Sequence, residues 1–98
     1  MRGIPKTFEL LGHTIKVVWQ ETPRNEAGEK CDGLWDINKL TIFLDTKQLP
    51  TMARHSFWHE VGHAILDLCG YSALSENEDL VDTLGGALAQ IDQTRKTQ

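Results

Sequence analysis

Short runs in which hydrophobic and polar residues alternate fill the first half of the chain and predict β-strands. In segment 14–19, the apolar residues Ile15, Val17 and Trp19 occupy every second position, which is the pattern of a strand with one buried face. Segment 7–11 is also short and largely apolar, and a glycine-containing turn joins the two segments. The pattern therefore predicts a hairpin near the start of the chain.

A second pair of short apolar runs follows a polar segment. Residues 20–33 are mostly polar and contain Pro and Gly, which favours a loop that is longer than most connections. Segments 34–37 and 40–44 then flank a turn at Asn38-Lys39. We therefore expect a second hairpin here.

After the second hairpin, the apolar residues recur at a spacing of three and four, which is typical of amphipathic helices. Pro50 suits a first helical turn, and Gly70 suits the position just after a last turn. We therefore expect a helix over 47–69. A second amphipathic helix is expected over 75–94, with Ser75 as its N-cap.

This order of elements predicts an α+β fold. We expect residues 1–98 to form one domain, in which segment 7–45 makes a small antiparallel sheet of three to four strands. The sheet would pack on the helix at 47–69 and on the C-terminal helix at 75–94. A chain of this length builds one modest core but not two.

The charge and composition disfavour several classes of partner. The formal net charge is -4 and the ten Lys and Arg residues are scattered, so nothing favours nucleic acid or an anionic membrane surface. The chain has neither an apolar N-terminal segment nor a run of about 18 apolar residues that would cross a bilayer. Cys31 and Cys69 are expected to be free thiols in a reducing environment, with Cys69 buried. We therefore expect a cytoplasmic protein that is a monomer or a weak homo-oligomer.

The first predicted helix carries the sequence His59-Glu60-Val61-Gly62-His63. Two histidines four residues apart lie one above the other on a helix, so both imidazoles can bind a single ion. Zinc binds neutral imidazole nitrogen readily and leaves room for a further ligand and a water. Glu60 is turned about 100° from His59 around the helix axis, so its carboxylate borders the ion and can accept a proton from water. The motif predicts a metal centre with two histidine ligands and a glutamate general base.

A third ligand is needed, and the acidic residues that follow the motif are the candidates: Asp67, Glu76, Glu78, Asp79 and Asp82. Asp67 lies a full turn beyond His63 and points past the ion. Glu78 and Asp82 lie four apart on one helix face, so one can bind the metal while the other accepts the outward N–H of a ligating imidazole. We favour Glu78 as the ligand. A capping box formed by Ser75 and Glu78 would explain this glutamate without any metal.

The motif resembles that of a known group of metallopeptidases. His59-Glu60-x-x-His63 followed by Glu78 and Asp82 is similar to the gluzincin pattern HExxH…ExxxD. The run that ends in this motif resembles the active-site helix of ImmA/IrrE-type peptidases. The chain length and the order of strands and helices resemble those of the single-domain minigluzincins.

The resemblance implies a minimal zincin-like fold and a role for each motif residue. His59, His63 and Glu78 would bind Zn²⁺, Glu60 would be the general base, and Asp82 would orient a histidine. The resemblance also implies an edge strand against which an extended peptide lies. Its residues would be Leu40, Thr41, Ile42, Phe43 and Leu44.

Three further residues each have two interpretations. Tyr71 either donates a hydrogen bond to a developing oxyanion or is a packing residue, and packing is favoured. His55 lies one turn before His59, too far along the axis to share the ion, so it either lines the cleft or is a surface histidine, which is favoured. Cys31 either latches onto the zinc from the long loop or is an exposed free thiol, which is favoured.

Together these features predict zinc-dependent hydrolysis of peptide bonds in a peptide or protein substrate. The alternative is a catalytically weak or inactive metal-binding module that binds a peptide or a regulatory partner. Glu60 favours the enzyme, because a structural metal site does not need it. The residues also suit Fe(II), so zinc is an expectation that metal analysis must test.

Overall fold

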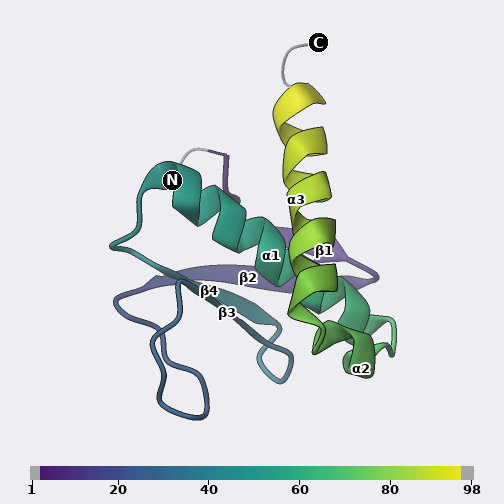
Figure 1. Cartoon of the computed structure of the whole chain (residues 1–98), viewed down its shortest axis with the longest axis horizontal. Coiled ribbons are helices and arrows are strands. Elements are labelled where there is room, and N and C mark those ends of the chain that lie inside the picture. Colours follow the sequence, from purple (N-terminus) through teal and green to yellow (C-terminus); the bar gives the residue numbers. More distant parts are fainter. Residues whose placement is uncertain (1–2, 96–98) are drawn as a thin grey trace.

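The computed structural model describes residues 3–95, which form four strands followed by three helices. The strands are β1 (Thr7–Leu10), β2 (His13–Gln20), β3 (Gly33–Asp36) and β4 (Thr41–Asp45). The helices are α1 (Pro50–Leu68), α2 (Ser72–Ser75) and α3 (Glu78–Arg95). Figure 1 shows α1 lying along the sheet and α3 rising steeply across α1. The expected α+β class is confirmed.

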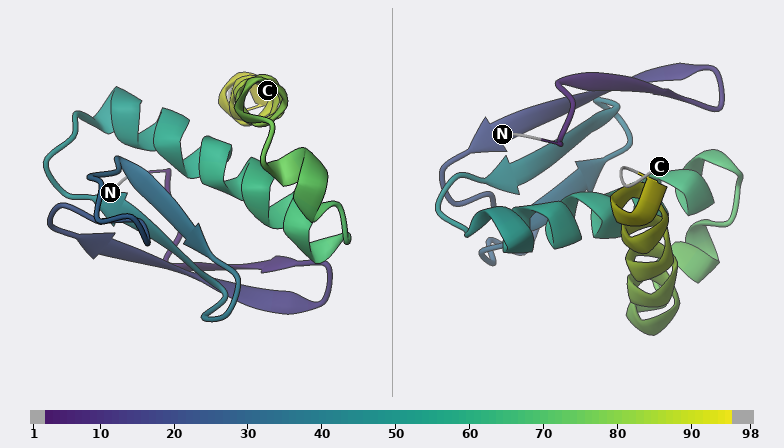
Figure 2. Two further views of the ribbon diagram at one scale, coloured as in Figure 1. Left: turned by 60° about the horizontal axis from the view of Figure 1, so that its bottom comes forward. Right: turned by 90° about the horizontal axis from the view of Figure 1, so that it is seen from above.

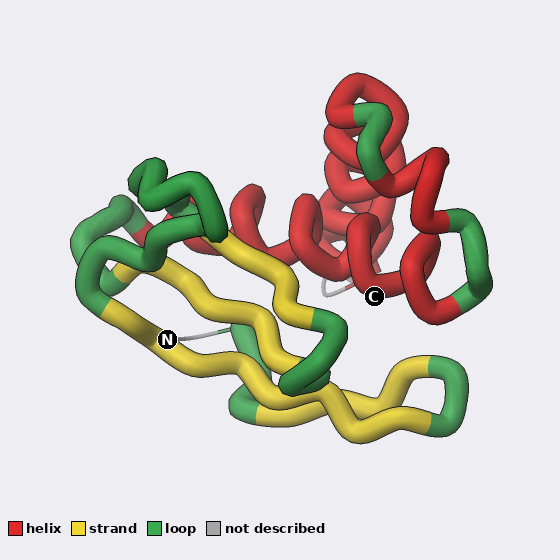
Figure 3. The backbone as a smooth tube through the Cα atoms, turned by 90° about the horizontal axis from the view of Figure 1, so that it is seen from below, coloured by secondary structure: helices red, strands yellow, loops and turns green. Residues whose placement is uncertain are grey.

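The strands form one sheet in the order β1-β2-β4-β3. Both expected hairpins are present, because β1 pairs antiparallel with β2 and β3 pairs antiparallel with β4. A parallel pairing of β2 with β4 joins the two hairpins, and neither hairpin pattern predicts it. The loop over residues 21–32 permits this pairing, since it carries the chain beyond β4 to the far edge of the sheet (Figure 3). Strands β2 and β4 are therefore internal.

The main core lies between one face of the sheet and α1 (Figure 2). Ile15, Ile42 and Leu44 are fully buried on that face, and they belong to one core with Phe57 and Val61 of α1. Burying a side chain of this size contributes roughly 1.5–3 kcal/mol to stability. The predicted apolar face of the first helix is thus the face that holds α1 on the sheet.

Helix α1 ends where its sequence predicts. The residue after its C-cap is Gly70, whose φ is 85°, a value that glycine adopts without steric strain. The N–H of Gly70 donates to the Asp67 carbonyl at 3.1 Å, and the N–H of Tyr71 donates to the Leu66 carbonyl at 2.7 Å. These are the two hydrogen bonds of a Schellman motif. The turn reverses the chain, so that α2 packs against α1.

The predicted second helix begins three residues later than expected in the structure. The segment Ser72–Ser75 forms the single-turn helix α2, and α3 begins at Glu78. The N–H of Leu80 donates to Asn77 Oδ1 at 3.1 Å, so Asn77 is the N-cap of α3. The expected helix start at Ser75 is therefore wrong. The capping-box explanation of Glu78 is also wrong, because the Ser75 hydroxyl lies against α1 and caps no helix.

Neither cysteine forms a disulfide, as expected. Cys31 is half-buried in the loop before β3, whereas Cys69 is exposed. The expectation that Cys69 is buried is wrong, because this residue is the C-cap of α1, where the chain leaves the packed helix. Within residues 3–95, no helix combines the length and the hydropathy that crossing a bilayer requires.

Candidate metal centre

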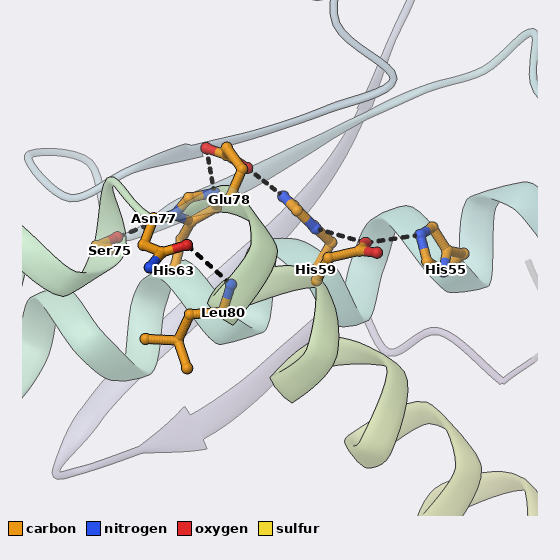
Figure 4. Close-up of polar contacts among 8 residues, drawn as sticks. His55, His59, His63, Ser75, Asn77, Glu78 and Leu80 are labelled. Atoms are coloured by element: carbon orange, nitrogen blue, oxygen red, sulfur yellow. Dashed lines mark hydrogen bonds and ion pairs between the residues drawn. The ribbon is translucent and has the colours of Figure 1, made fainter.

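Two histidines of α1 and one glutamate of α3 converge where these helices meet (Figure 4). His59 Nε2 lies 2.9 Å from Glu78 Oε1, and His63 Nε2 lies 3.4 Å from Glu78 Oε2. One ligand atom from each of the three residues lies within 4.8 Å of the other two. The histidine side chains are 20% and 16% exposed, and that of Glu78 is 67% exposed. The site is therefore open to solvent on the side of Glu78.

The spacing of these atoms suits a zinc ion. Nitrogen and oxygen ligands lie about 2.0–2.2 Å from zinc, so neighbours in a tetrahedral shell are about 3.3–3.5 Å apart. The 3.4 Å separation between His63 Nε2 and Glu78 Oε2 has this value. The 2.9 Å separation between His59 Nε2 and Glu78 Oε1 is shorter, at hydrogen-bond length, so binding of an ion would require the exposed Glu78 side chain to move back by a few tenths of an ångström. Two imidazoles and one carboxylate would leave a fourth position for water, as catalytic zinc sites do. His59, His63 and Glu78 are thus the residues that could hold a divalent ion.

The second ring nitrogen of each histidine also has a partner. His59 Nδ1 lies 3.3 Å from Asp82 Oδ1, and His63 Nδ1 lies 2.9 Å from Ser75 Oγ. When Nδ1 carries the proton and donates it to these oxygens, Nε2 keeps its lone pair for a metal. The sequence predicts this role for Asp82. It does not predict the role for Ser75, which reaches His63 only because α2 folds back on α1.

Asp82 is shared between two histidines. His55 Nε2 lies 3.2 Å from the same Oδ1 atom that contacts His59. The His55 side chain is 55% exposed, as expected of a surface histidine, and its ring centroid is 6.5 Å from that of His59. His55 therefore joins the site through Asp82, and it is not one of the three residues grouped around the candidate ion.

Glu60 lies beside these ligands and is only 7% exposed. Burial is the largest influence on its carboxyl group and, with the negative charge of Glu78, raises the pKa of Glu60 to about 7. The positive charge of His59 and a hydrogen bond from the backbone N–H of Trp35 act in the opposite direction. A carboxyl group with a pKa near neutrality can both accept and return a proton at pH 7.

Strand β3 passes close to Glu60. A Cβ atom at Gly33 would lie 3.0 Å from Glu60 Cγ and 3.3 Å from its Oε2, so glycine leaves the room that this carboxylate occupies. The backbone N–H of Trp35 binds the same carboxylate. The edge of the sheet is therefore part of the site, which sequence reasoning missed.

The edge strand beside the site is β3 and not β4. Strand β4 pairs with β2 on one side and with β3 on the other, so it has no free edge for a peptide. The parallel pairing with β2 is the physical reason. The expectation of a substrate-binding edge is wrong for Leu40, Thr41, Ile42, Phe43 and Leu44.

The free edge of β3 presents the backbone groups of Gly33 and Trp35. The N–H of Asp45 donates to the Asp32 carbonyl at 2.9 Å, and Gly33 directly follows Asp32. Because hydrogen-bonded residues alternate along an antiparallel pair, the N–H and C=O groups of Gly33 and Trp35 point away from β4. The hydrogen bond from Trp35 to Glu60 has this direction. Within residues 3–95 this edge of β3 pairs with no other strand, and it faces the candidate metal centre, where Glu60 accepts the hydrogen bond of the Trp35 N–H.

A cavity of about 400 Å³ adjoins the site. Its walls come from β3, the second half of α1, α2 and the segment that leads into α3: Leu34, Trp35, Glu60, His63, Asp67, Ser72, Ser75, Glu76 and Glu78. Asp67 Oδ2 accepts a hydrogen bond from Trp35 Nε1 at 2.9 Å, so Asp67 belongs to this wall and not to the ligand group, as its position in the helix predicts. Glu76 also lines the cavity without joining the ligand group.

Two other candidate residues do not contribute to the cavity. Tyr71 is 57% exposed and does not line it, so the packing interpretation is wrong and the oxyanion role has no support from its position.

Cys31 does not line the cavity either. Burial, with the nearby negative charges of Glu60 and other carboxylates, raises the pKa of the Cys31 thiol. Its Sγ contacts the Glu29 carbonyl at 3.5 Å. Cys31 is outside the ligand group of the described residues.

The close crossing of α1 and α3 determines where Glu78 can reach. A Cβ atom at Gly85 would lie 2.9 Å from both His59 Cα and the Trp58 carbonyl oxygen, so the two backbones are in direct contact. Glycine inside a helix costs roughly 0.5–1 kcal/mol relative to alanine. Its presence in α3 is the sequence signal that could have predicted this contact.

A larger cavity of about 660 Å³ lies among α1, α3 and β1. Its walls are mainly apolar and include Phe8, Phe57 and Leu88, together with the ion pair of Asp92 and Arg95 at 3.0 Å. None of the predicted site residues lines it. Glu60, His63 and Glu78 instead line the smaller cavity.

No protein-family model, curated protein or solved structure matches this chain. The gluzincin resemblance of the motif therefore stays a prediction.

Proposed function

We propose that this chain is a minimal, gluzincin-type zinc peptidase that hydrolyses peptide bonds with Glu60 as general base. The observation that supports the proposal is the convergence of His59, His63 and Glu78 beside a buried carboxylate whose pKa is near 7. A structural metal site has no use for that carboxylate. We also propose that the protein works in the cytoplasm, where its two free thiols would stay reduced.

The proposed chemistry divides the work among residues of the site. A bound zinc ion supplies Lewis acidity, which makes water easier to deprotonate and a carbonyl group easier to attack. Glu60 accepts the proton of the attacking water and later delivers it to the leaving amine. Asp82 and Ser75 hold the two imidazoles in the orientation that directs Nε2 toward the ion.

The proposed substrate is an extended peptide that adds to the free edge of β3. The outward N–H and C=O groups of Gly33 and the outward C=O group of Trp35 are the backbone partners for such a strand, whereas the Trp35 N–H binds Glu60. Gly33 also lies against Glu60, so a peptide on this edge would pass beside the general base. This edge replaces the segment 40–44 as the proposed substrate-binding strand.

A second candidate function is a metal-binding interaction module that holds a peptide or regulatory partner without cleaving it. One observation favours it: Tyr71, the predicted candidate for stabilising an oxyanion, is 57% exposed and does not line the cavity. In such a module, Glu60 would be a buried carboxyl group without a catalytic role.

Metal analysis and peptide cleavage distinguish the two functions. The wild-type chain, Glu60→Gln and His63→Ala are each dialysed against zinc, and the bound metal is measured by mass spectrometry. The zinc-loaded proteins are then incubated with a proteome-derived peptide library. If the protein is a peptidase, we expect the wild type to bind one zinc ion per chain and to cleave peptides. Glu60→Gln should bind one zinc ion but cleave no peptide, and His63→Ala should lose zinc. Cleavage by Glu60→Gln at the wild-type rate would refute the general base.

A further inference from the structure

The cavity beside the candidate metal centre is acidic. Four of its lining side chains are carboxylates, namely Glu60, Asp67, Glu76 and Glu78, and His63 is its single basic lining residue. No Lys or Arg of the described residues lines it. None of the ion pairs found within residues 3–95 involves Asp67 or Glu76.

A metal ion would leave part of this charge uncompensated. The charge of a divalent cation held by His59, His63 and Glu78 would be offset by the carboxylates of Glu78 and the adjacent Glu60. Asp67 and Glu76 line the same cavity but are outside the ligand group. Two carboxylates of the cavity, those of Asp67 and Glu76, therefore remain without a partner cation among the described residues.

One of these carboxylates is fixed in place by an aromatic side chain. Trp35 Nε1 donates to Asp67 Oδ2 at 2.9 Å, and both residues are partly buried and line the cavity. The hydrogen bond links β3 to α1 and leaves the second oxygen of Asp67 available. An indole beside a carboxylate attracts Lys and Arg, through the ring face and through a charge-assisted hydrogen bond.

The position of Trp35 connects this wall to the proposed chemistry. Its backbone N–H binds Glu60 while its indole binds Asp67, so one residue touches both the general base and the acidic wall. A peptide on the free edge of β3 would place a side chain beside Trp35 when its scissile bond is beside Glu60.

From this geometry we infer that the cavity is a specificity pocket for a Lys or Arg side chain next to the cleaved bond. The inference rests on the proposed peptidase function. Asp67 and Glu76 are its specificity residues, and Trp35 is its aromatic wall. Attraction between an ammonium or guanidinium group and two nearby carboxylates amounts to at least about tenfold in binding, and it weakens as salt screens it.

The test of cleavage uses the zinc-loaded chain and a peptide library in which all residues are represented. We expect Lys or Arg to be enriched at one position adjoining the cleaved bond. The double variant Asp67→Asn/Glu76→Gln should lose the enrichment of basic residues, because the amide side chains have nearly the same shape as the carboxylates but no negative charge. The amide oxygen at position 67 can still accept the hydrogen bond from Trp35. The control is Asp79→Asn, an exposed acid of α3 that does not line the cavity, and it should keep the enrichment. Cleavage without a preference for basic residues would overturn the inference and leave the peptidase function intact.

A binding experiment measures the preference of the cavity for a positive charge without requiring cleavage. Glu60→Gln with one equivalent of zinc is titrated with acetyl-Ala-Ala-X-Ala-Ala-amide, where X is Lys or its uncharged isostere norleucine. We expect the Lys peptide to bind at least about tenfold more tightly at low salt, and the double variant to lose this difference while Asp79→Asn keeps it. Equal affinity for the two peptides would overturn the inference. Absence of cleavage together with a Lys preference would instead refute the peptidase and support the interaction module.

Discussion

The crossing of α1 and α3 offers a direct test of how the site is assembled, because two adjacent glycines of α3 lie in opposite environments. A Cβ at Gly85 would lie 2.9 Å from His59 Cα, whereas ordinary van der Waals contact begins at 3.4 Å. A Cβ at Gly86 meets nothing within 4 Å. The variants Gly85→Ala and Gly86→Ala therefore add the same methyl group to the same helix with different consequences.

The expected energies follow from these contacts. Replacing a helical glycine by alanine stabilises a helix by about 1 kcal/mol, and Gly86→Ala should show this gain. Gly85→Ala has the same gain but must move α3 away from α1 by about 0.5 Å, and overpacking of this kind costs about 1–3 kcal/mol. In a domain of this size, 1 kcal/mol corresponds to about 4–8 °C in Tm. Gly85→Ala should therefore melt at least about 5 °C below Gly86→Ala.

The same displacement should weaken the metal centre. The ligands of a metal site must stay within about 0.5 Å of their positions for the site to keep its function. Glu78 and Asp82 lie on the part of α3 that must move by this distance. We expect zinc affinity, measured by competition with a chromophoric chelator, to fall about tenfold in Gly85→Ala and to be unchanged in Gly86→Ala. If the two variants melt together and bind zinc equally well, the backbones are not in contact and the proposed placement of Glu78 is wrong.

Three further predictions concern single side chains around the site. In the metal-free chain, the pKa of Glu60 is raised from 4.5 to about 7, so the folded state binds this proton more tightly than the unfolded chain does. The free energy of unfolding is therefore highest below about pH 4.5 and falls by about 3 kcal/mol as the pH rises through about 7. Glu60→Gln should flatten that part of the pH dependence of Tm, and an unchanged slope would contradict the burial of this carboxyl. Ser75→Ala removes the hydroxyl that contacts His63 and should weaken zinc binding about 10–100-fold. His55→Ala removes only an exposed contact with Asp82 that solvent screens, and it should change zinc affinity less than about threefold. Equal losses of affinity in a chelator competition would refute this distinction. Gly33→Ala, which places a methyl group 3.0 Å from Glu60 Cγ, should lower kcat/KM about tenfold with zinc content unchanged, and full activity in peptide cleavage would show that β3 does not constrain the general base.

The part of the site that lies on α1 could be predicted from the sequence because it depends on local geometry. The spacing of four between His59 and His63 fixes their common face once the segment is helical, and Pro50 and Gly70 mark the ends of that helix. The strand hairpins are local in the same sense. Each was predicted from a short apolar alternation and a turn, and each is present.

The part of the site contributed by other elements required information that no local pattern contains. Glu78 and Asp82 were expected to lie near the histidines because they share a helix face, and both contact His59, although the helix was expected to begin at Ser75. The division between α2 and α3 at Asn77 changes what Ser75 does: its hydroxyl contacts His63 and does not cap a helix.

The choice of edge strand shows why the remaining error arose. A hairpin pattern states which strands are neighbours in sequence but not on which side a hairpin joins the rest of the sheet. Joined through β4, this hairpin leaves β3 free and turns Gly33 and Trp35 toward Glu60. Joined through β3 it would have buried those groups and left the segment 40–44 as the edge. A single pairing, β2 with β4, therefore determines which strand edge is left unpaired and which tryptophan lies beside the candidate metal centre.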